Sequence, residues 1–199
     1  SVAKYFLYDC EGAAKVRDDQ IMVYCSHGSG GLKSVKGKLS VSDRVNYVLV
    51  PSQQYAPVFA EQCSIKWPDD RLVSIGYPVH DIFFRPGAPE TDKITDRKYK
   101  KIILWMPTFR RGGGFRRNDS TKEQKLGIPL IDTMDEYGRL NDYLRRADVF
   151  LVIKIHPKQD LSNLRVGDCT NIKVLTGKTV KELDIDNYRL MKASDALVS

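Results

Sequence analysis

Residues 148–155 read DVFLVIKI, and this segment decides the fold class of the chain. Only Asp148 and Lys154 interrupt an otherwise apolar run, a pattern typical of a strand buried on both faces of a parallel sheet. The preceding residues, 132–147, place Met134, Tyr137, Leu140 and Leu144 at helical spacing and therefore predict an amphipathic helix. A helix leading directly into a buried strand indicates an α/β fold.

Seven further apolar runs predict strands along the chain. They cover residues 5–9, 20–25, 44–50, 71–76, 101–106, 171–175 and the last residues, 195–199. Ser52 can cap a helix that runs to about Cys63. We therefore expect an α/β fold with two Rossmann-like parallel-sheet units. The first would cover residues 1–84, a polar segment at 85–100 would be the linker, and the second would cover 101–199.

Composition excludes several classes of function. The chain of 199 residues is 42% hydrophobic and 29% charged, as is ordinary for a globular protein, and no apolar run is long enough to span a bilayer. Its 4 cysteines are scattered without a CxxC pair, which argues against a zinc site or a disulfide framework. The net charge of +7 favours phosphate-rich partners or an anionic membrane surface, and a solvated basic surface is the alternative. No nucleic-acid-binding motif accompanies this charge.

A glycine-rich loop, CSHGSGGLKSVKG at 25–37, follows the predicted strand 20–25. It fails as a Walker A motif because Leu32 precedes Lys33, and as GxGxxG because Lys33 takes the place of the third glycine. A histidine, His27, remains on a flexible turn beyond a strand, where it could act as a general base. The alternative is a turn whose histidine has no chemical role.

Two more predicted strand ends carry candidate phosphate ligands. ILWMPTFRRGG at 103–113 delivers Thr108 and Arg110 into a loop, and VIKIHPK at 152–158 ends its strand in His156. An arginine fork suits phosphate oxygens. A solvated basic loop and a structural histidine remain the alternatives. DID at 184–186 imitates a DxD metal motif, but we expect ordinary acids at a helix start and no metal site.

Taken in order, these stretches resemble the CDP-glycerol glycerophosphotransferase family of teichoic-acid-type primases and polymerases. The matching elements are His27-Gly28 with Lys33, Gly76-Tyr77-Pro78 with Asp81, MPTFR at 106–110, KIHP at 154–157, and YRLMKASDALVS at 188–199. The chain departs from the family at Ser26, where the family has Trp, and at Val79, where it has Arg.

The resemblance implies a GT-B-like α/β fold with two Rossmann-type domains facing a cleft. It also implies a transferase that moves glycerol phosphate, or a related polyol phosphate, from a CDP-activated donor. His27 would deprotonate an acceptor hydroxyl, which attacks the β-phosphorus and releases CMP. His156 would be the second catalytic residue, with Thr108, Arg110, Ser194 and Asp195 binding the donor phosphates. The acceptor side would include Gly28, Lys33 and Asp81.

The resemblance also implies a CDP-polyol substrate without further cofactor or metal, and a lipid-linked or polymer acceptor of teichoic acid or capsule type. The protein would act in the cytoplasm at the inner face of the cell membrane, without nucleic acid. We further expect that an N-terminal part is missing and that the second domain is truncated at Ser199. A GT-B glycosyltransferase using a nucleotide sugar, or a non-enzymatic phosphate- or nucleic-acid-binding module, is the alternative function.

Overall fold

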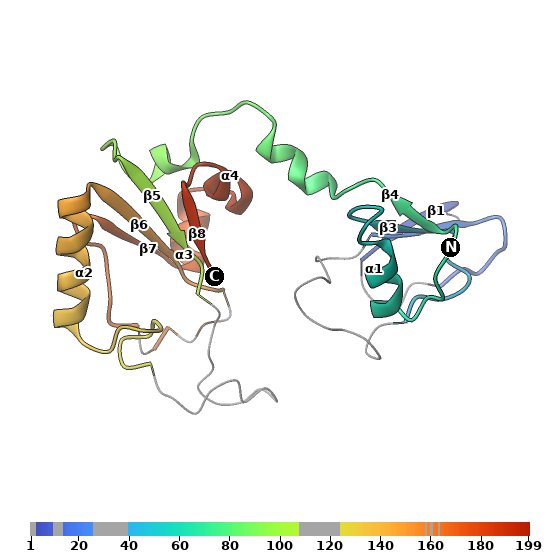
Figure 1. Ribbon diagram of the computed structural model, residues 1–199, viewed down its shortest axis with the longest axis horizontal. Helices are drawn as coiled ribbons and strands as arrows, with labels where there is room; N and C mark the ends of the chain where they lie inside the picture. The colour runs from blue at the N-terminus through green and yellow to red at the C-terminus, as the bar shows by residue number, and fades with distance from the viewer. Residues whose placement is uncertain are drawn as a thin grey trace. The chain divides into compact units, whose positions relative to one another are not determined.

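The computed structural model describes residues 3–9, 14–25, 40–107, 124–157, 159, 161–162 and 164–199. Internal contacts divide the chain into two compact units, Ser1–Asp81 and Ile82–Ser199, each built on its own sheet (Figure 1). Both sheets are parallel throughout, which confirms the α/β class predicted from the apolar runs.

The sheet of the first unit follows chain order, β1-β2-β3-β4. Its strands are β1 (Tyr5–Tyr8), β2 (Ile21–Tyr24), β3 (Tyr47–Val50) and β4 (Leu72–Ser74). All four strands lie within the predicted runs. Because they are parallel, their carboxyl ends meet at one edge of the sheet, and the loop that follows each strand begins there.

The two faces of this sheet differ in burial. One face packs against α1 (Ala56–Gln62) and buries Val48, Val50 and Phe59 in a common core. On the other face, Tyr5 and Leu7 are 63% and 73% exposed. In the described part of this unit, β1 is therefore exposed on one of its two faces. This exposure could not be predicted from the sequence, because β1 carries apolar or aromatic residues on both faces and their presence does not show whether a helix covers each face.

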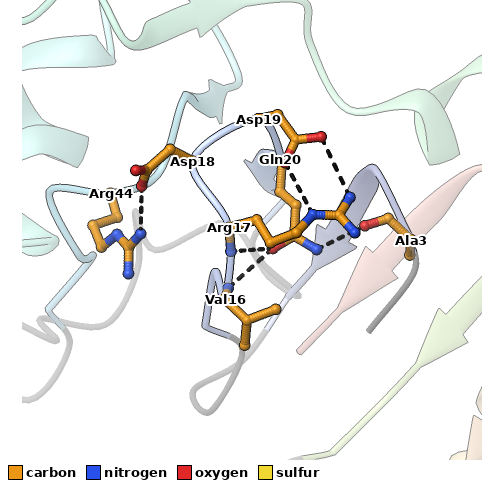
Figure 2. Close-up of polar contacts among 7 residues, drawn as sticks. All are labelled: Ala3, Val16, Arg17, Asp18, Asp19, Gln20 and Arg44. Carbon is orange, nitrogen blue, oxygen red and sulfur yellow. Dashed lines mark hydrogen bonds and ion pairs between the residues drawn. The ribbon is translucent and has the colours of Figure 1, made fainter.

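A buried glutamine holds the entry into β2 (Figure 2). Gln20 is 1% exposed, and its Oε1 accepts hydrogen bonds from the backbone N–H groups of Val16 and Arg17 at 3.0 Å. Its Nε2 donates to the carbonyl of Ala3 at 2.8 Å, which ties this turn to the start of β1. With all these polar groups paired, Gln20 serves the fold, since an unpaired buried amide would destabilise it.

The first helix begins later than the sequence predicted. The N-cap of α1 is Tyr55, and the hydroxyl of Ser52 instead accepts a hydrogen bond from the backbone N–H of Tyr55 at 3.1 Å. Ser52 thus closes the turn before the helix and is not its cap. Pro57 lies in the first helical turn, where its missing N–H has no partner to lose.

The second unit has the strand order β7-β6-β5-β8. Its strands are β5 (Lys101–Trp105), β6 (Val149–Lys154), β7 (Ile172–Leu175) and β8 (Ala196–Val198), and all four were predicted. From β5 the chain moves outward through β6 to β7 and then returns to the other side of β5. The order reverses between β5 and β8, and this point is where open parallel sheets bind ligands, beyond the carboxyl ends of the strands.

Helices cover both faces of this second sheet (Figure 1). On one face lies α2 (Met134–Ala147), which buries Tyr137 and Leu144 against Leu151 and Ile153 of β6. The other face carries α3 (Gly177–Glu182) and α4 (Asn187–Lys192), with Leu190 of α4 fully buried. The helix predicted at 132–147 is confirmed, but Met134 is 55% exposed and does not belong to its buried face.

The polar segment that the sequence suggested as a linker packs on α4. Within this segment, 85–100, lies the short 3-10 helix η2 (Glu90–Lys93), and another, η1 (Pro78–Phe83), precedes it. Glu90, which is 2% exposed, accepts a hydrogen bond from the backbone N–H of Asp186 at 2.8 Å. The ring of Phe83 meets Tyr188 edge to face at 6.2 Å between centroids. Residues from Ile82 onward therefore fold with the second unit.

Candidate functional site

His156 stands at the carboxyl edge of the second sheet, two residues beyond the end of β6. The backbone N–H of Ile155 donates to the carbonyl of Leu175 at 2.8 Å, so pairing with β7 continues past the strand end. The carbonyl of His156 accepts from the N–H of Gln159 at 2.9 Å. Its half-buried side chain is thus carried on a backbone fixed on both sides.

Lys154, the last residue of β6, is not among the site residues that the sequence predicted. Its side chain is only 5% exposed, and no ion pair or hydrogen bond joins it to another of the described residues. Burial lowers the pKa of its ammonium group. Strand alternation places Lys154 on the face of β6 that carries Phe150 and Val152, opposite α3 and α4. A lysine of such low exposure, with no counter-charge among the described residues, favours an anionic ligand at this position.

The end of β5 forms the other side of the reversal point. The backbone N–H of Met106 donates to the carbonyl of Val198 at 2.8 Å, which extends the pairing of β5 with β8 to the sheet edge. Pro107 follows and is buried. The predicted phosphate ligands Thr108 and Arg110 come directly after it in the sequence, outside the described residues.

Ser194 and Asp195 lie at the opposite edge of the same sheet. Asp195 precedes β8 and exchanges hydrogen bonds with Ile102 near the start of β5, while the hydroxyl of Ser194 donates to the carbonyl of Leu190 at 2.8 Å. Ile102 pairs with Phe150, six residues before His156, which corresponds to about 20 Å along the strand. The structure therefore does not bring Ser194 and Asp195 together with His156.

The residues predicted to serve the acceptor side fall within the range of the first unit. His27, Gly28 and Lys33 follow β2 but lie outside the described residues. The backbone N–H of Cys25 donates to the carbonyl of Tyr8 at 2.8 Å, so the chain leaves β2 at the carboxyl edge. Asp81 is exposed within η1 and ends the first unit.

The described residues contain neither a cluster of metal ligands nor a helix that could span a membrane. No group of three or more His, Cys, Asp or Glu side chains is arranged there to hold a metal ion. Asp186 of the DID sequence accepts a hydrogen bond from the N–H of Arg189 and caps α4, as expected for an acid at a helix start. None of the helices in these parts of the chain is long and apolar enough to cross a membrane.

Comparison with known proteins decides the family. The model of the CDP-glycerol:poly(glycerophosphate) glycerophosphotransferase family matches residues 18–199. The chain belongs to this family. The resemblance inferred from the HG loop, MPTFR, KIHP and the terminal SDALVS run is thereby confirmed.

Relatives of this glycerophosphotransferase family chain are teichoic acid enzymes. Over 168 residues it is 33% identical to the teichoic acid glycerol-phosphate primase of Bacillus subtilis (strain 168). The matched region covers 83% of this chain and 37% of the primase. The structure of the wall teichoic acid polymerase TagF matches with a TM-score of 0.61 at 17% identity, over 98% of this chain and 49% of TagF. A histidine-to-asparagine variant of TagF soaked with CDPG matches with a TM-score of 0.58 at 16% identity, over 98% of this chain and 48% of that one. The chain thus spans less than half the length of these relatives, and its fold is similar to that of TagF.

Proposed function

We propose that the protein transfers glycerol phosphate, or a related polyol phosphate, from a CDP-activated donor to a hydroxyl acceptor in the synthesis of a teichoic-acid-type polymer. The observation that carries this proposal is the family match over residues 18–199. The parallel sheet whose carboxyl edge holds His156 supports it, because that edge is where such sheets bind nucleotides. The 33% identity to a glycerol-phosphate primase supports glycerol phosphate, or a related polyol phosphate, as the group that is transferred.

In the proposed reaction, His27 takes the proton from the acceptor hydroxyl. The hydroxyl oxygen then bonds to the β-phosphorus of the donor, and the bond from that phosphorus to the bridging oxygen breaks. CMP leaves with the bridging oxygen and its electron pair. This displacement needs a base beside the attacking hydroxyl and positive charge beside the leaving phosphate, because the leaving phosphate gains negative charge.

Positive charge would come from the second unit. We assign His156, Thr108 and Arg110 to the donor phosphates and add Lys154, whose nearly buried ammonium lacks a counter-charge among the described residues. Lys154 and His156 are two residues apart on an extended backbone, so their side chains leave the strand on the same side. We leave Ser194 and Asp195 out of this set, because their contacts tie the start of β8 to α4 and β5 at the other sheet edge.

We extend the proposal to the arrangement of the two domains and to the place of the enzyme in the cell. The two sheet-containing units would act as the acceptor and donor domains of a GT-B-like enzyme facing a common cleft. A lipid-linked or polymer acceptor would place the enzyme at the inner face of the cell membrane, where the net charge of +7 suits anionic lipids. No cofactor beyond the CDP-polyol substrate is required, since cationic side chains can stabilise the leaving group.

The test is release of CMP from CDP-glycerol by the full-length protein in the presence of acceptor. We expect His27→Ala and His156→Ala each to lower kcat by roughly 100-fold or more, as for loss of a general acid–base or charge-stabilising group. Arg139→Ala, an exposed change on α2, is the matched control with unchanged rate. Protection against thermal unfolding by a nucleotide sugar, but not by CDP-glycerol, would contradict the proposal and favour a glycosyltransferase.

A further inference from the structure

Four tyrosines gather at the carboxyl edge of the first sheet, one from the end of each strand. Tyr8 and Tyr24 are the last residues of β1 and β2, Tyr55 follows β3 as the N-cap of α1, and Tyr77 comes three residues after β4. In sequence they are scattered over 70 positions, from 8 to 77. Parallel strand order brings them to one edge, which is also the edge at which β2 leads toward His27.

Contacts join Tyr8, Tyr24 and Tyr55 into one cluster, and Tyr77 follows the neighbouring strand β4 at the same sheet edge. The rings of Tyr8 and Tyr24 lie 5.2 Å apart between centroids, and Tyr24 is 3% exposed in the core to which Tyr8 and Tyr55 also pack. Burial raises the pKa of the Tyr77 phenol, and the neighbouring Tyr55 and Cys63 raise it further. Tyr8, Tyr55 and Tyr77 each remain partly exposed, so the cluster reaches the surface of the unit.

One hydroxyl in this cluster lacks a partner. The Oη atom of Tyr55 is buried and has no hydrogen-bond partner in the described part of the chain. A phenol hydroxyl in that position loses its bonds to water and gains none in return, which is unfavourable unless a ligand supplies them. The core needs only the ring, and a phenylalanine would supply that without an unpaired hydroxyl.

We propose that Tyr8, Tyr55 and Tyr77 form a subsite for the polyhydroxylated part of the acceptor, with Tyr24 as its buried floor. Tyrosine suits such a ligand because its ring packs against the C–H face of a sugar or polyol while its hydroxyl exchanges hydrogen bonds with the ligand hydroxyls. This inference rests on the proposed transferase function. A sugar ring and a linear polyol share the chemistry that these residues recognise, so the experiment tests both.

Tyr55→Phe in the full-length protein is the decisive change, since it removes the unpaired hydroxyl and keeps the ring. We expect the KM for a hydroxyl acceptor, a soluble glycerol phosphate oligomer or a hexoside-terminated one, to rise roughly five- to tenfold, the effect of one lost hydrogen bond. The KM for CDP-glycerol should stay within about twofold, because the donor binds elsewhere. Thermal stability should be unchanged or higher, because the variant buries no unpaired polar atom.

Tyr5→Phe is the matched control, since Tyr5 begins the same strand as Tyr8 and is 63% exposed. It should change neither KM. Independently of turnover, methyl hexoside or glycerol 3-phosphate added to tyrosine-labelled protein should shift the NMR signals of Tyr55 and Tyr77 but not that of Tyr5. The probe that produces the shift tells a sugar-binding subsite from a polyol-binding one.

The outcomes separate this inference from the proposed function. If CMP is released normally while the acceptor KM of Tyr55→Phe is unchanged and no ring signal moves, the subsite is wrong and the transferase function stands. If the ring signals shift with either probe but CDP-glycerol is never turned over, the transferase proposal fails, and these tyrosines bind a polyhydroxylated ligand that is not an acceptor of that reaction. A rise in acceptor KM that is accompanied by a lower Tm of Tyr55→Phe, with no shift of the tyrosine NMR signals, would also overturn the subsite.

Discussion

The carboxylate of Asp195 accepts a hydrogen bond from the backbone N–H of Ile102 at 2.8 Å, and the N–H of Asp195 donates to the carbonyl of Ile102 at the same distance. Its second oxygen lies 2.6 Å from the ammonium of Lys101. These contacts attach the start of β8 to β5. They give Asp195 a structural role at the amino edge of the sheet, far from the carboxyl ends at which His156 lies.

Asp195→Ala should lower the stability of the second unit more than Asp195→Asn, because asparagine keeps an oxygen that can accept from Ile102. Hydrogen bonds from Lys101 and Ile102 hold the pKa of Asp195 below its usual range. A carboxylate with a lowered folded-state pKa contributes stability above its ordinary pKa and loses it as the pH falls toward the folded value. Urea unfolding at pH 7 and near pH 3 measures this. An unchanged unfolding midpoint together with a raised KM for CDP-glycerol would instead support a donor role.

Lys154→Met should have opposite effects on stability and on donor binding. Removal of a buried charge without a described counter-charge should raise the free energy of unfolding, and loss of a phosphate ligand should raise the KM for CDP-glycerol. Lys173→Met on β7 is the control, because Lys173 already pairs with Asp168 at 2.6 Å. A Lys154 variant that is less stable and binds donor normally would show that this lysine serves only the fold.

The pH dependence of stability provides a second test of Lys154. Burial lowers its pKa in the folded state, so between that value and the ordinary lysine pKa the unfolded chain binds more protons than the folded one. Stability should therefore rise with pH in this window below about 10.5, the ordinary lysine value. The rise should be smaller in Lys154→Met. Equal slopes in wild type and variant, from denaturant midpoints between neutral pH and pH 10, would contradict the lowered pKa.

Leu190→Ala should be among the more damaging changes in the second unit. Leu190 of α4 is fully buried with Leu104, Phe150 and Leu175. Truncation of a buried leucine costs about 2–5 kcal/mol through lost burial and the cavity left behind. Leu130→Ala is the control for side-chain size, because Leu130 is 92% exposed. Denaturant unfolding compares the two, and a similar loss for both would argue against the packing of α4 on this sheet.

Thr133→Ala should destabilise α2 by about 1 kcal/mol, the usual cost of losing an N-cap side chain. The hydroxyl of Thr133 accepts from the backbone N–H of Glu136 at 3.2 Å, and the Glu136 carboxylate accepts from the N–H of Thr133 at 3.0 Å. Arg139→Ala serves as the control, since its exposed ion pair with Asp135 contributes little. Thermal unfolding gives the comparison, and equal shifts in Tm would rule out an energetic role for the cap.

Strand positions followed from local pattern, because short continuous apolar runs rich in Val, Ile and Leu are typical of strands in a parallel sheet. The runs around Leu104 and Ile153 therefore predicted β5 and β6 correctly. Burial of individual side chains followed less well. Met134 fits the helical spacing of Tyr137 and Leu144 but lies at the first turn of α2, where it is 55% exposed.

The sequence order of the motifs does not show at which edge of a sheet each residue lies. The terminal SDALVS run matches the family, and this led to a phosphate-binding prediction for Ser194 and Asp195. Only the register of β8 against β5, with Ala196 opposite Ile103, shows that these residues lie at the amino edge. Likewise, nothing in the spacing of Tyr8, Tyr55 and Tyr77 indicates a cluster, because three different strands carry them to one place.

The sequence by itself determined the family, the α/β class, the eight strands of the described residues and the candidate His156 at a strand end, because each can be recognised from short local motifs. The tertiary structure alone decided the strand order that reverses between β5 and β8, the burial of Lys154 and the separation of Asp195 from His156. The reason is physical: strand pairing and burial arise from contacts between segments far apart in sequence, and no local pattern of residues encodes which segments will meet.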